Sequence, residues 1–334
     1  MGSNRISVAC NDKYRLEVED KRKARITFFT PTYNRARFIP RVENCLTNQT
    51  CKDFVWIIVN DGSKDNTDEI AMSILQKEEL PIKYISKPNG GKHSAFRAAL
   101  EQCETSYFQC MDDDDLYFPG AVDFFLRKWS DIKKVGNEDI GAIRTLTKRP
   151  DGSYMANFDV KENEEYDADT TESYYILKRI QENWTCYDTA KLASIDLFKT
   201  YWMSECHKFV VESIWQTRFA RKFKCRFVNV AFREYREDDV VSLTRAEKSR
   251  QHYLDVFLNN KVTLDEQIDI ILKYDWIELA RRIVLVNFFR DYLDIGFGDL
   301  MKNTDSHLLR VLYCLTWLPS LVGKPILHFA IRHR

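Results

Sequence analysis

The sequence lacks both a net charge and an apolar N-terminal segment. Fifty Lys and Arg residues balance fifty Asp and Glu residues, so no overall field draws the chain toward nucleic acid. Any charged ligand must therefore be held by local groups. Residues 1–23 are polar and charged, without the apolar core of a secretory signal. We expect a cytoplasmic protein that does not bind nucleic acid.

Closely spaced cysteine pairs are missing as well. None of the nine cysteines forms a CxxC motif, and a chain of 334 residues does not need a disulfide framework to fold. We expect reduced, mostly buried thiols. Because 44% of the residues are apolar, the chain can bury a full core, as one large domain or two smaller ones.

The first part of the chain alternates short apolar runs with amphipathic segments. Apolar runs bounded by turn residues predict buried strands, and apolar residues at helical spacing predict helices. Such alternation favours a mostly parallel, Rossmann-like sheet covered by helices. The expected strands are residues 25–30, 54–63 with its terminal turn, 82–86 and 106–111, and the expected helices are residues 36–46, 65–76 and 91–103.

Conspicuous polar segments follow these expected strands. They read TPTYNR, VNDGSKDNT, PNGGKHSAFRAAL and MDDDDLYFPGA, in this order along the chain. In open α/β sheets, ligands bind beyond the carboxyl ends of the strands. The order and position of the four segments therefore indicate one ligand site at that edge.

These four segments closely resemble the nucleotide-sugar-binding half of family 2 glycosyltransferases with a GT-A fold. The resemblance is good over residues 24–130 and looser over residues 180–245. It implies a nucleotide-sugar donor, an inverting transfer to a saccharide or lipid-linked saccharide acceptor, and three regions. These regions are a nucleotide-sugar-binding half at residues 24–130, an acceptor and catalytic-base half at residues 131–250, and a helical C-terminal region at residues 251–334.

The four consecutive aspartates hold the DxD element that the resemblance implies. Adjacent carboxylates repel each other unless cations or hydrogen-bond donors compensate, and hard oxygen ligands suit Mn²⁺ or Mg²⁺. By the resemblance, Asp112 lies near the ribose, Asp113 belongs to the donor site and Asp114 binds the metal. Asp115 is an outer partner. The alternative is a solvated acidic turn that caps the helix expected near Pro119.

Other donor residues follow from the same resemblance. The TPTYNR segment also acts as a turn that caps a helix. The alternative role of Asp61 is that of a plain helix cap. Small residues in the Asn-Gly-Gly loop let the backbone approach the donor. The resemblance places Thr30, Thr32 and Tyr33 along the nucleotide, Arg35 and Lys92 near phosphate, Asp61 at the base, and Gly91 in the glycine loop.

The predicted catalytic base is Glu212, at the start of a helix expected from about residue 211. A helix N-terminus favours the ionised carboxylate that a base requires. The family usually has Glu-Asp here, whereas Ser213 follows Glu212. The alternative is an ordinary first-turn glutamate. In residues 235–243, Val240 replaces an expected glycine, and the segment is either a loop over the donor phosphates, with Arg236 and Arg245 as ligands, or a surface loop.

The last 29 residues contain no Asp or Glu. Residues 311–323 are apolar but shorter than the ~20 residues that span a bilayer. They therefore favour either an interfacial segment or a helical hairpin packed on the protein or on a second subunit. The first alternative predicts peripheral contact with the inner face of the membrane, and the second allows a homo-oligomer.

The sequence thus predicts a metal-dependent, inverting glycosyltransferase of polysaccharide or glycolipid assembly. Two other functions stay open. One is a nucleotidyltransferase on the same sheet, although no glycine-rich triphosphate signature is present. The other is a catalytically silent nucleotide-sugar-binding protein with a membrane-binding or partner-binding tail.

Overall fold

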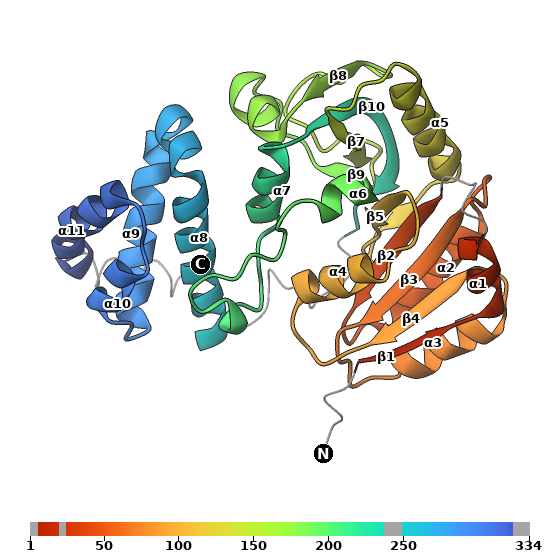
Figure 1. The fold of residues 1–334 in the computed structure, drawn as a ribbon, viewed down its shortest axis with the longest axis horizontal. Helices are drawn as coiled ribbons and strands as arrows, with labels where there is room; N and C mark the ends of the chain where they lie inside the picture. The colour runs from red at the N-terminus through yellow and green to blue at the C-terminus, as the bar shows by residue number, and fades with distance from the viewer. Residues whose placement is uncertain (1–5, 20–24, 237–248, 323–334) are drawn as a thin grey trace. The chain divides into compact units, whose positions relative to one another are not determined.

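A computed structural model describes residues 6–19, 25–236 and 249–322 (Figure 1). By internal contacts the chain divides into two compact units. The first comprises Met1–Phe198 and Arg218–Arg245, and the second comprises Lys199–Thr217 and Ala246–Arg334. The three regions expected from the sequence are divisions by function, which such contacts do not test, and they stay predictions.

The first unit is built on a ten-stranded sheet with helices against its faces. Its elements confirm the strands and helices expected before residue 135, to within a few residues. The described elements are β1 (Ser7–Cys10), α1 (Asp12–Glu19), β2 (Ile26–Thr32), η1 (Ala36–Phe38), α2 (Ile39–Thr47), β3 (Phe54–Asn60), α3 (Thr67–Gln76), β4 (Ile82–Ser86), α4 (Lys92–Glu101), β5 (Tyr107–Cys110), β6 (Leu116–Tyr117), α5 (Ala121–Lys134), β7 (Ile140–Lys148), β8 (Glu165–Ala168), η2 (Glu172–Ile176), β9 (Asn183–Asp188), α6 (Thr189–Ala193) and β10 (Lys224–Glu234).

The core of the sheet is parallel and its margins are mixed. The strand order is β1-β4-β3-β2-β5-β9-β7-β10-β6, and β8 pairs with β10. Strands β4, β3, β2 and β5 run parallel, as do β7 and β10. Strand β9 is antiparallel to both of its neighbours, β5 and β7. The predicted Rossmann-like α/β fold is therefore confirmed, with an antiparallel strand inserted between its two parallel parts.

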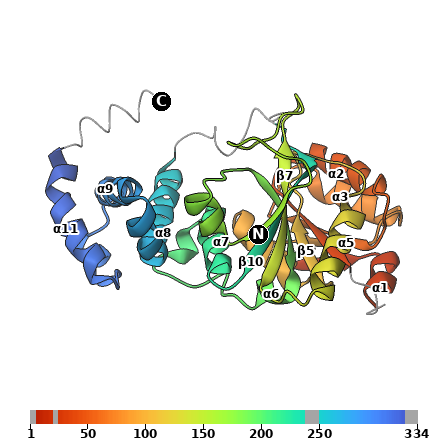
Figure 2. The same cartoon turned by 90° about the horizontal axis from the view of Figure 1, so that it is seen from above.

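Successive side chains of β2 point to opposite faces of the sheet and contact different helices there. Phe28 belongs to a core cluster that includes residues of α2, α3 and α5. The next residue, Phe29, points to the opposite face, where its ring packs against Phe96 of α4 and Phe108. Figure 2 shows α2, α3 and α5 on one side of the strands. Because β3, β2 and β5 are neighbours, their carboxyl ends and the loops that follow lie side by side.

The second unit is helical. Helix α7 (Glu212–Ala220) crosses the boundary between the units at residue 217, and the described elements that lie wholly in the second unit are η3 (Ser204–Cys206), α8 (Arg250–Tyr274), α9 (Trp276–Tyr292), α10 (Phe297–Lys302) and α11 (His307–Val322). Leu258, Val286 and Leu300 are fully buried in their shared core. Burial of these apolar side chains holds the helices of this unit together.

One side of α11 is part of this core. Leu309 and Tyr313 are fully buried, and Asn287 of α9 donates to the Tyr313 carbonyl at 3.0 Å. The other side exposes Val311 and Leu315, at 56% and 68%. The packed helix of the sequence prediction is therefore present, while an interfacial role of the exposed side stays a prediction. Within the described part of the chain, none of the helices is long and apolar enough to span a membrane.

Candidate donor-binding site

The four aspartates lie in the turn between β5 and β6, and their burial alternates. Asp113 and Asp115 are buried, whereas Asp112 and Asp114 are partly exposed. The run thus separates into one pair that faces the protein and one pair that faces solvent. Among the residues that the structure describes, no group of three or more His, Cys, Asp or Glu side chains could hold a metal ion.

Two cations from neighbouring loops compensate three of these carboxylates. The Arg35 Nη1 donates to Oδ1 of Asp113 at 3.0 Å and to Oδ2 of Asp114 at 2.8 Å. The Lys92 Nζ lies 2.8 Å from Oδ1 of Asp112. The loops after β2 and β4 therefore meet the turn after β5, as the order of the strands predicts. These cations offset the repulsion between the neighbouring carboxylates that follow β5.

Sequence reasoning did not identify a third cation, Arg233 on β10. Its Nε lies 2.5 Å from Oδ2 of Asp115, its Nη1 3.2 Å from Glu182, and its Nη2 3.6 Å from Oδ2 of Asp112. The side chain is only 10% exposed. Arg233 and Asp115 are 118 residues apart, and a single arginine in a strand is the only sequence signal.

These contacts separate the pKa values of the aspartates. Burial raises the pKa of Asp112, but the charges of Lys92 and Arg233 outweigh it and bring the value down to about 2. Burial raises the pKa of Asp113 to about 7, although Arg35 opposes the shift. Asp113 Oδ2 is a buried acceptor without a hydrogen bond within the described residues. One carboxylate of the turn is thus firmly ionised, and a neighbour titrates near neutral pH.

Asp61 organises the glycine loop that the sequence places near the donor. Its Oδ2 accepts from the Gly91 N–H at 2.7 Å, its Oδ1 accepts from the Gly90 N–H at 3.0 Å, and the Lys87 Nζ lies 2.5 Å from Oδ1. A Cβ on Gly90 would come within 2.5 Å of the Ser94 Oγ, so a larger residue there would require the Ser94 side chain to move. Gly91 caps α4 with φ of 88°. The contact of Asp61 with a base stays a prediction beside this observed role.

The predicted donor residues at the end of β2 lie partly in the core and partly at the surface. Thr30 is fully buried, and its Oγ1 accepts from the Trp56 Nε1 at 2.9 Å, so its hydroxyl bonds inside the core. Thr32 is buried with an Oγ1 that has no hydrogen-bond partner in the described chain. Tyr33 is 44% exposed. Of these three residues Tyr33 is the exposed one, and the donor contacts of all three stay predictions.

Glu212 belongs to the second unit and is an exposed residue in the first turn of α7. Its Oε2 lies 3.5 Å from the Gln216 Nε2. The predicted helix start is confirmed, and the role as base stays a prediction. In the loop that follows β10, the Arg236 N–H donates to Asp115 at 3.1 Å. Val240 and Arg245, the other residues named in that segment, lie outside the described residues, as do Asp238 and Asp239.

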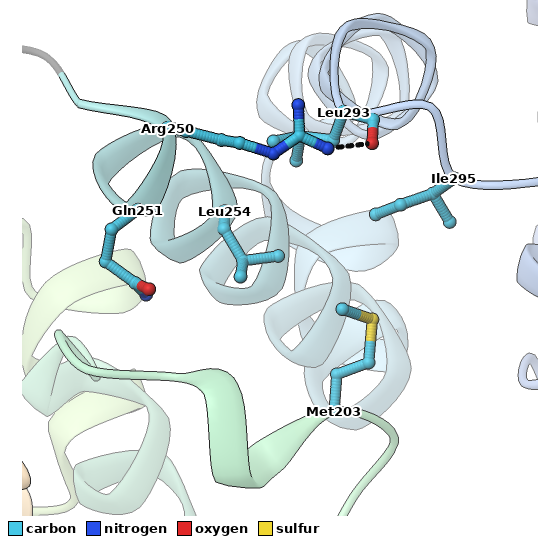
Figure 3. A pocket seen from close by; sticks show the side chains of 6 residues that line it. All are labelled: Met203, Arg250, Gln251, Leu254, Leu293 and Ile295. Carbon is cyan, nitrogen blue, oxygen red and sulfur yellow. Dashed lines mark hydrogen bonds between the residues drawn. The ribbon is translucent and has the colours of Figure 1, made fainter.

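A separate hollow of about 360 Å³ lies within the second unit (Figure 3). Two of its lining residues are joined by a hydrogen bond, which Arg250 donates to the Leu293 carbonyl at 2.7 Å. None of the residues predicted to bind the donor lines it; the lining side chains are Met203, Arg250, Gln251, Leu254, Leu293 and Ile295.

Several known proteins resemble part of the chain. A chondroitin synthase of Pasteurella multocida is 34% identical over 147 residues, which are 42% of this chain and 15% of that protein. A teichoic acid poly(glycerol phosphate) polymerase of Staphylococcus epidermidis is 30% identical over 146 residues, or 42% of this chain and 20% of that protein. The chain therefore matches only a small part of the length of these relatives.

Solved structures resemble the chain over nearly its whole length. Residues 1–349 of S. aureus TarS, in complex with UDP-GlcNAc, superpose with a TM-score of 0.55, cover 90% of this chain and 91% of that one, and share 17% identity. At this identity the likeness concerns the fold alone, and it confirms the predicted GT-A architecture. The model of the family described as glycosyl transferase family 2 matches residues 27–185. The chain therefore contains a glycosyl transferase family 2 domain with a GT-A fold.

Proposed function

We propose that this chain transfers a sugar, with inversion, from a nucleoside-diphosphate donor to a hydroxyl group of a saccharide or lipid-linked saccharide. The observation that carries the proposal is the meeting of three strand-end loops at one set of carboxylates. Arg35 follows β2, Lys92 follows β4, and both pair with the aspartates that follow β5. A family 2 domain with charged groups from three loops at this edge suits a donor that carries a diphosphate.

The charges of the site fit a divalent cation. Five carboxylates, those of residues 112–115 and Glu182, pair with three cations, Arg35, Lys92 and Arg233. Arg41 donates to the carbonyl oxygen of Asp114 at 2.7 Å. Mg²⁺ and Mn²⁺ at substrate phosphates need only one or two protein carboxylates. We propose Asp114, which is partly exposed, as the ligand of Mn²⁺ or Mg²⁺. The ion would act as a Lewis acid on the departing diphosphate.

The chain's own residues bind and orient the donor in this proposal. Asp112 accepts hydrogen bonds from the ribose, because its low pKa keeps it ionised. Lys92 and Arg35 attract the phosphates, and the Gly90–Gly91 backbone, fixed by Asp61, allows close approach. Thr32, Tyr33 and Asp61 contact the nucleotide, and Asp113 belongs to the same site.

Glu212 is the proposed base that accepts the proton of the attacking hydroxyl. Inversion by a single displacement needs such a base, and a carboxylate in the first turn of a helix is stabilised in its ionised form. Its exposure leaves it accessible to an acceptor. This role is independent of the donor residues, and it has its own test below.

We further propose a setting in polysaccharide or glycolipid assembly at the inner face of the membrane. The names of two relatives, a chondroitin synthase and a teichoic acid polymerase, support a polymeric acceptor. The exposed apolar side of α11, followed by a C-terminal sequence without acidic residues, supports contact with an anionic surface.

A panel of nucleotide sugars, screened for thermal stabilisation with and without Mn²⁺, tests the proposal, since a ligand of the folded state raises its apparent stability. We expect one donor to stabilise the chain and to release its nucleoside diphosphate when acceptor is added. Release of pyrophosphate from a nucleoside triphosphate would instead indicate a nucleotidyltransferase. Binding without turnover on any saccharide acceptor would indicate a silent binding protein.

A further inference from the structure

We propose that Arg35 is an exchangeable counterion of the aspartate turn. It pairs with Asp113 and Asp114 while the donor is absent and moves to the donor's diphosphate when metal and donor bind together. The inference rests on the proposed function and goes beyond it, because it assigns Arg35 two alternative partners. It also predicts that Arg35 opposes the binding of a metal ion alone.

The positions of the atoms show a direct competition. The Arg35 Nη1 lies 2.8 Å from the same Asp114 Oδ2 that would coordinate an ion. Mg²⁺ binds carboxylate oxygens at about 2.0–2.1 Å, so an ion on this oxygen would lie within a few ångströms of the guanidinium charge. The two cations therefore cannot share that oxygen favourably. Metal binding requires the guanidinium to leave, unless an anion separates them.

The donor's diphosphate is such an anion. Arginine recognises phosphate through paired N–H donors at least as well as it recognises carboxylate. When the diphosphate enters, Arg35 can exchange its carboxylate partners for phosphate oxygens and leave Asp114 to the metal. Metal and nucleotide would then bind cooperatively. The diphosphate draws Arg35 away from the metal site, and the metal replaces Arg35 as the partner of Asp114.

Arg35 is more exposed than Arg233, the other arginine that pairs with the aspartate turn. The Arg233 side chain is 10% exposed and touches three carboxylates from the β5–β6 turn and from the residue before β9. The Arg35 side chain is 22% exposed and follows β2 in a loop, at the start of the short helix η1. One arginine is thus fixed inside the protein, and the other lies at the surface of the site.

The other oxygen of Asp113 bears on the same Arg35–Asp113 pair. This oxygen, Oδ2, accepts no hydrogen bond within the described chain, although the side chain is only 3% exposed. The charged partner of Asp113 in this part of the chain is Arg35, and the Thr32 hydroxyl is the other side chain that stabilises its ionised form. Such an arrangement suits a resting state in which Arg35 compensates the turn until a ligand arrives.

The proposal predicts that Arg35→Gln changes two affinities in opposite directions. Arg35→Gln should raise the affinity for Mn²⁺ alone roughly tenfold or more, because the competing charge is gone. The same variant should bind nucleoside diphosphate with Mn²⁺ roughly tenfold more weakly, because a phosphate partner is gone. A merely structural arginine would lower both affinities or neither.

Titration calorimetry with Mn²⁺ alone, and with nucleoside diphosphate in saturating Mn²⁺, measures both effects on the full chain. Arg35→Lys keeps the charge and should stay near the parent for Mn²⁺ alone. Lys64→Gln, which removes an exposed positive charge from the loop after β3, controls for net charge and should change neither affinity by more than about twofold.

An unchanged or weaker affinity of Arg35→Gln for Mn²⁺ alone would overturn the counterion exchange. The parent's turnover of a nucleotide sugar would remain, so the proposed function would survive that result. A parent that binds neither Mn²⁺ nor any nucleotide would instead contradict the proposed function itself. An equal gain in Arg35→Gln and Lys64→Gln would assign the effect to net charge and would also overturn the exchange.

Discussion

Both units bury polar side chains, but those of the second unit bond mainly to its own backbone. Asp255 accepts from the Lys208 N–H at 2.8 Å, and Asn259 accepts from the Val211 N–H at 3.0 Å and donates to the Phe209 carbonyl at 2.7 Å. These bonds satisfy backbone groups that would otherwise be buried without partners. Buried polarity in this unit therefore holds the segment before α7 against α8.

In the first unit, the buried and partly buried charges at the strand ends bond to one another instead. Arg35, Lys92 and Arg233 come from three separate segments, and each contacts the aspartate turn. Removing these charges from water costs free energy, and apolar side chains could fill a purely structural role without that cost. The comparison teaches that burial of a charge alone does not indicate a site, whereas convergence of opposite charges from several loops at one edge does.

The largest expected effect is on catalysis, in Glu212→Gln. The amide keeps the shape of the side chain but cannot accept a proton, so transfer should fall ~10²- to 10⁴-fold. Donor and metal binding should be unchanged, because Glu212 has no proposed donor contact. Rates with a verified acceptor, together with donor affinity, check this. Near-parental transfer would move the base elsewhere, first to Asp238 or Asp239.

Exchange of one buried cation in each unit sharpens the comparison. Arg233→Met leaves Asp115 without its compensating charge and Asp112 with Lys92 alone, which should lower the free energy of unfolding by about 3–5 kcal/mol and weaken donor binding. Lys261→Met, a matched change at a side chain 3% exposed on α8, should also destabilise but leave donor affinity intact. Denaturation and nucleotide titration separate the two. Equal loss of donor affinity in both variants would break the comparison.

The raised pKa of Asp113 predicts a smaller, pH-dependent effect. Burial holds its pKa at about 7, above the ordinary value of 3.8. Between these values the folded state binds a proton that the unfolded state has lost, so stability falls as pH rises. From pH 5 to pH 7 this amounts to on the order of 2 kcal/mol. Asp113→Asn should flatten the decline, and an identical slope in parent and variant would contradict the shifted pKa.

The smallest effect on stability is expected on the exposed side of α11. Val311→Glu should change the free energy of unfolding by less than about 0.5 kcal/mol, since the side chain is 56% exposed. If this side contacts a membrane, sedimentation with anionic vesicles should fall several-fold. Val135→Glu, at another exposed valine, is the control. Unchanged vesicle binding would remove support for the interfacial role.

The sequence predicts the parallel core because its signals there are local. Continuous apolar runs, capping residues and strand-end polar segments identify β2 to β5 and the helices between them. The same logic places Arg35, Asp61, Lys92 and the aspartates at one edge. The apolar pattern near the C-terminus likewise allowed a packed helix, and Tyr313 is buried in the helical core.

What the sequence does not predict depends on distant pairing. Strand β9 lies between β5 and β7 although it follows both in the chain, and no local pattern specifies that insertion. Arg233 is brought to the aspartates only by the pairing of β10 with β6 and β7. The pairing of Arg35 with Asp114 is likewise visible only in three dimensions, because phosphate and carboxylate attract a guanidinium alike.

The central claim is that the converging loops bind a metal ion and a nucleotide sugar together. Titration of the nucleotide-sugar donor into parent and Asp114→Asn, each with and without Mn²⁺, tests it most directly. We predict that Mn²⁺ strengthens donor binding in the parent and does not change donor binding in Asp114→Asn. The parent and the variant should unfold at similar temperatures. Equal strengthening by Mn²⁺ in parent and variant would contradict the claim.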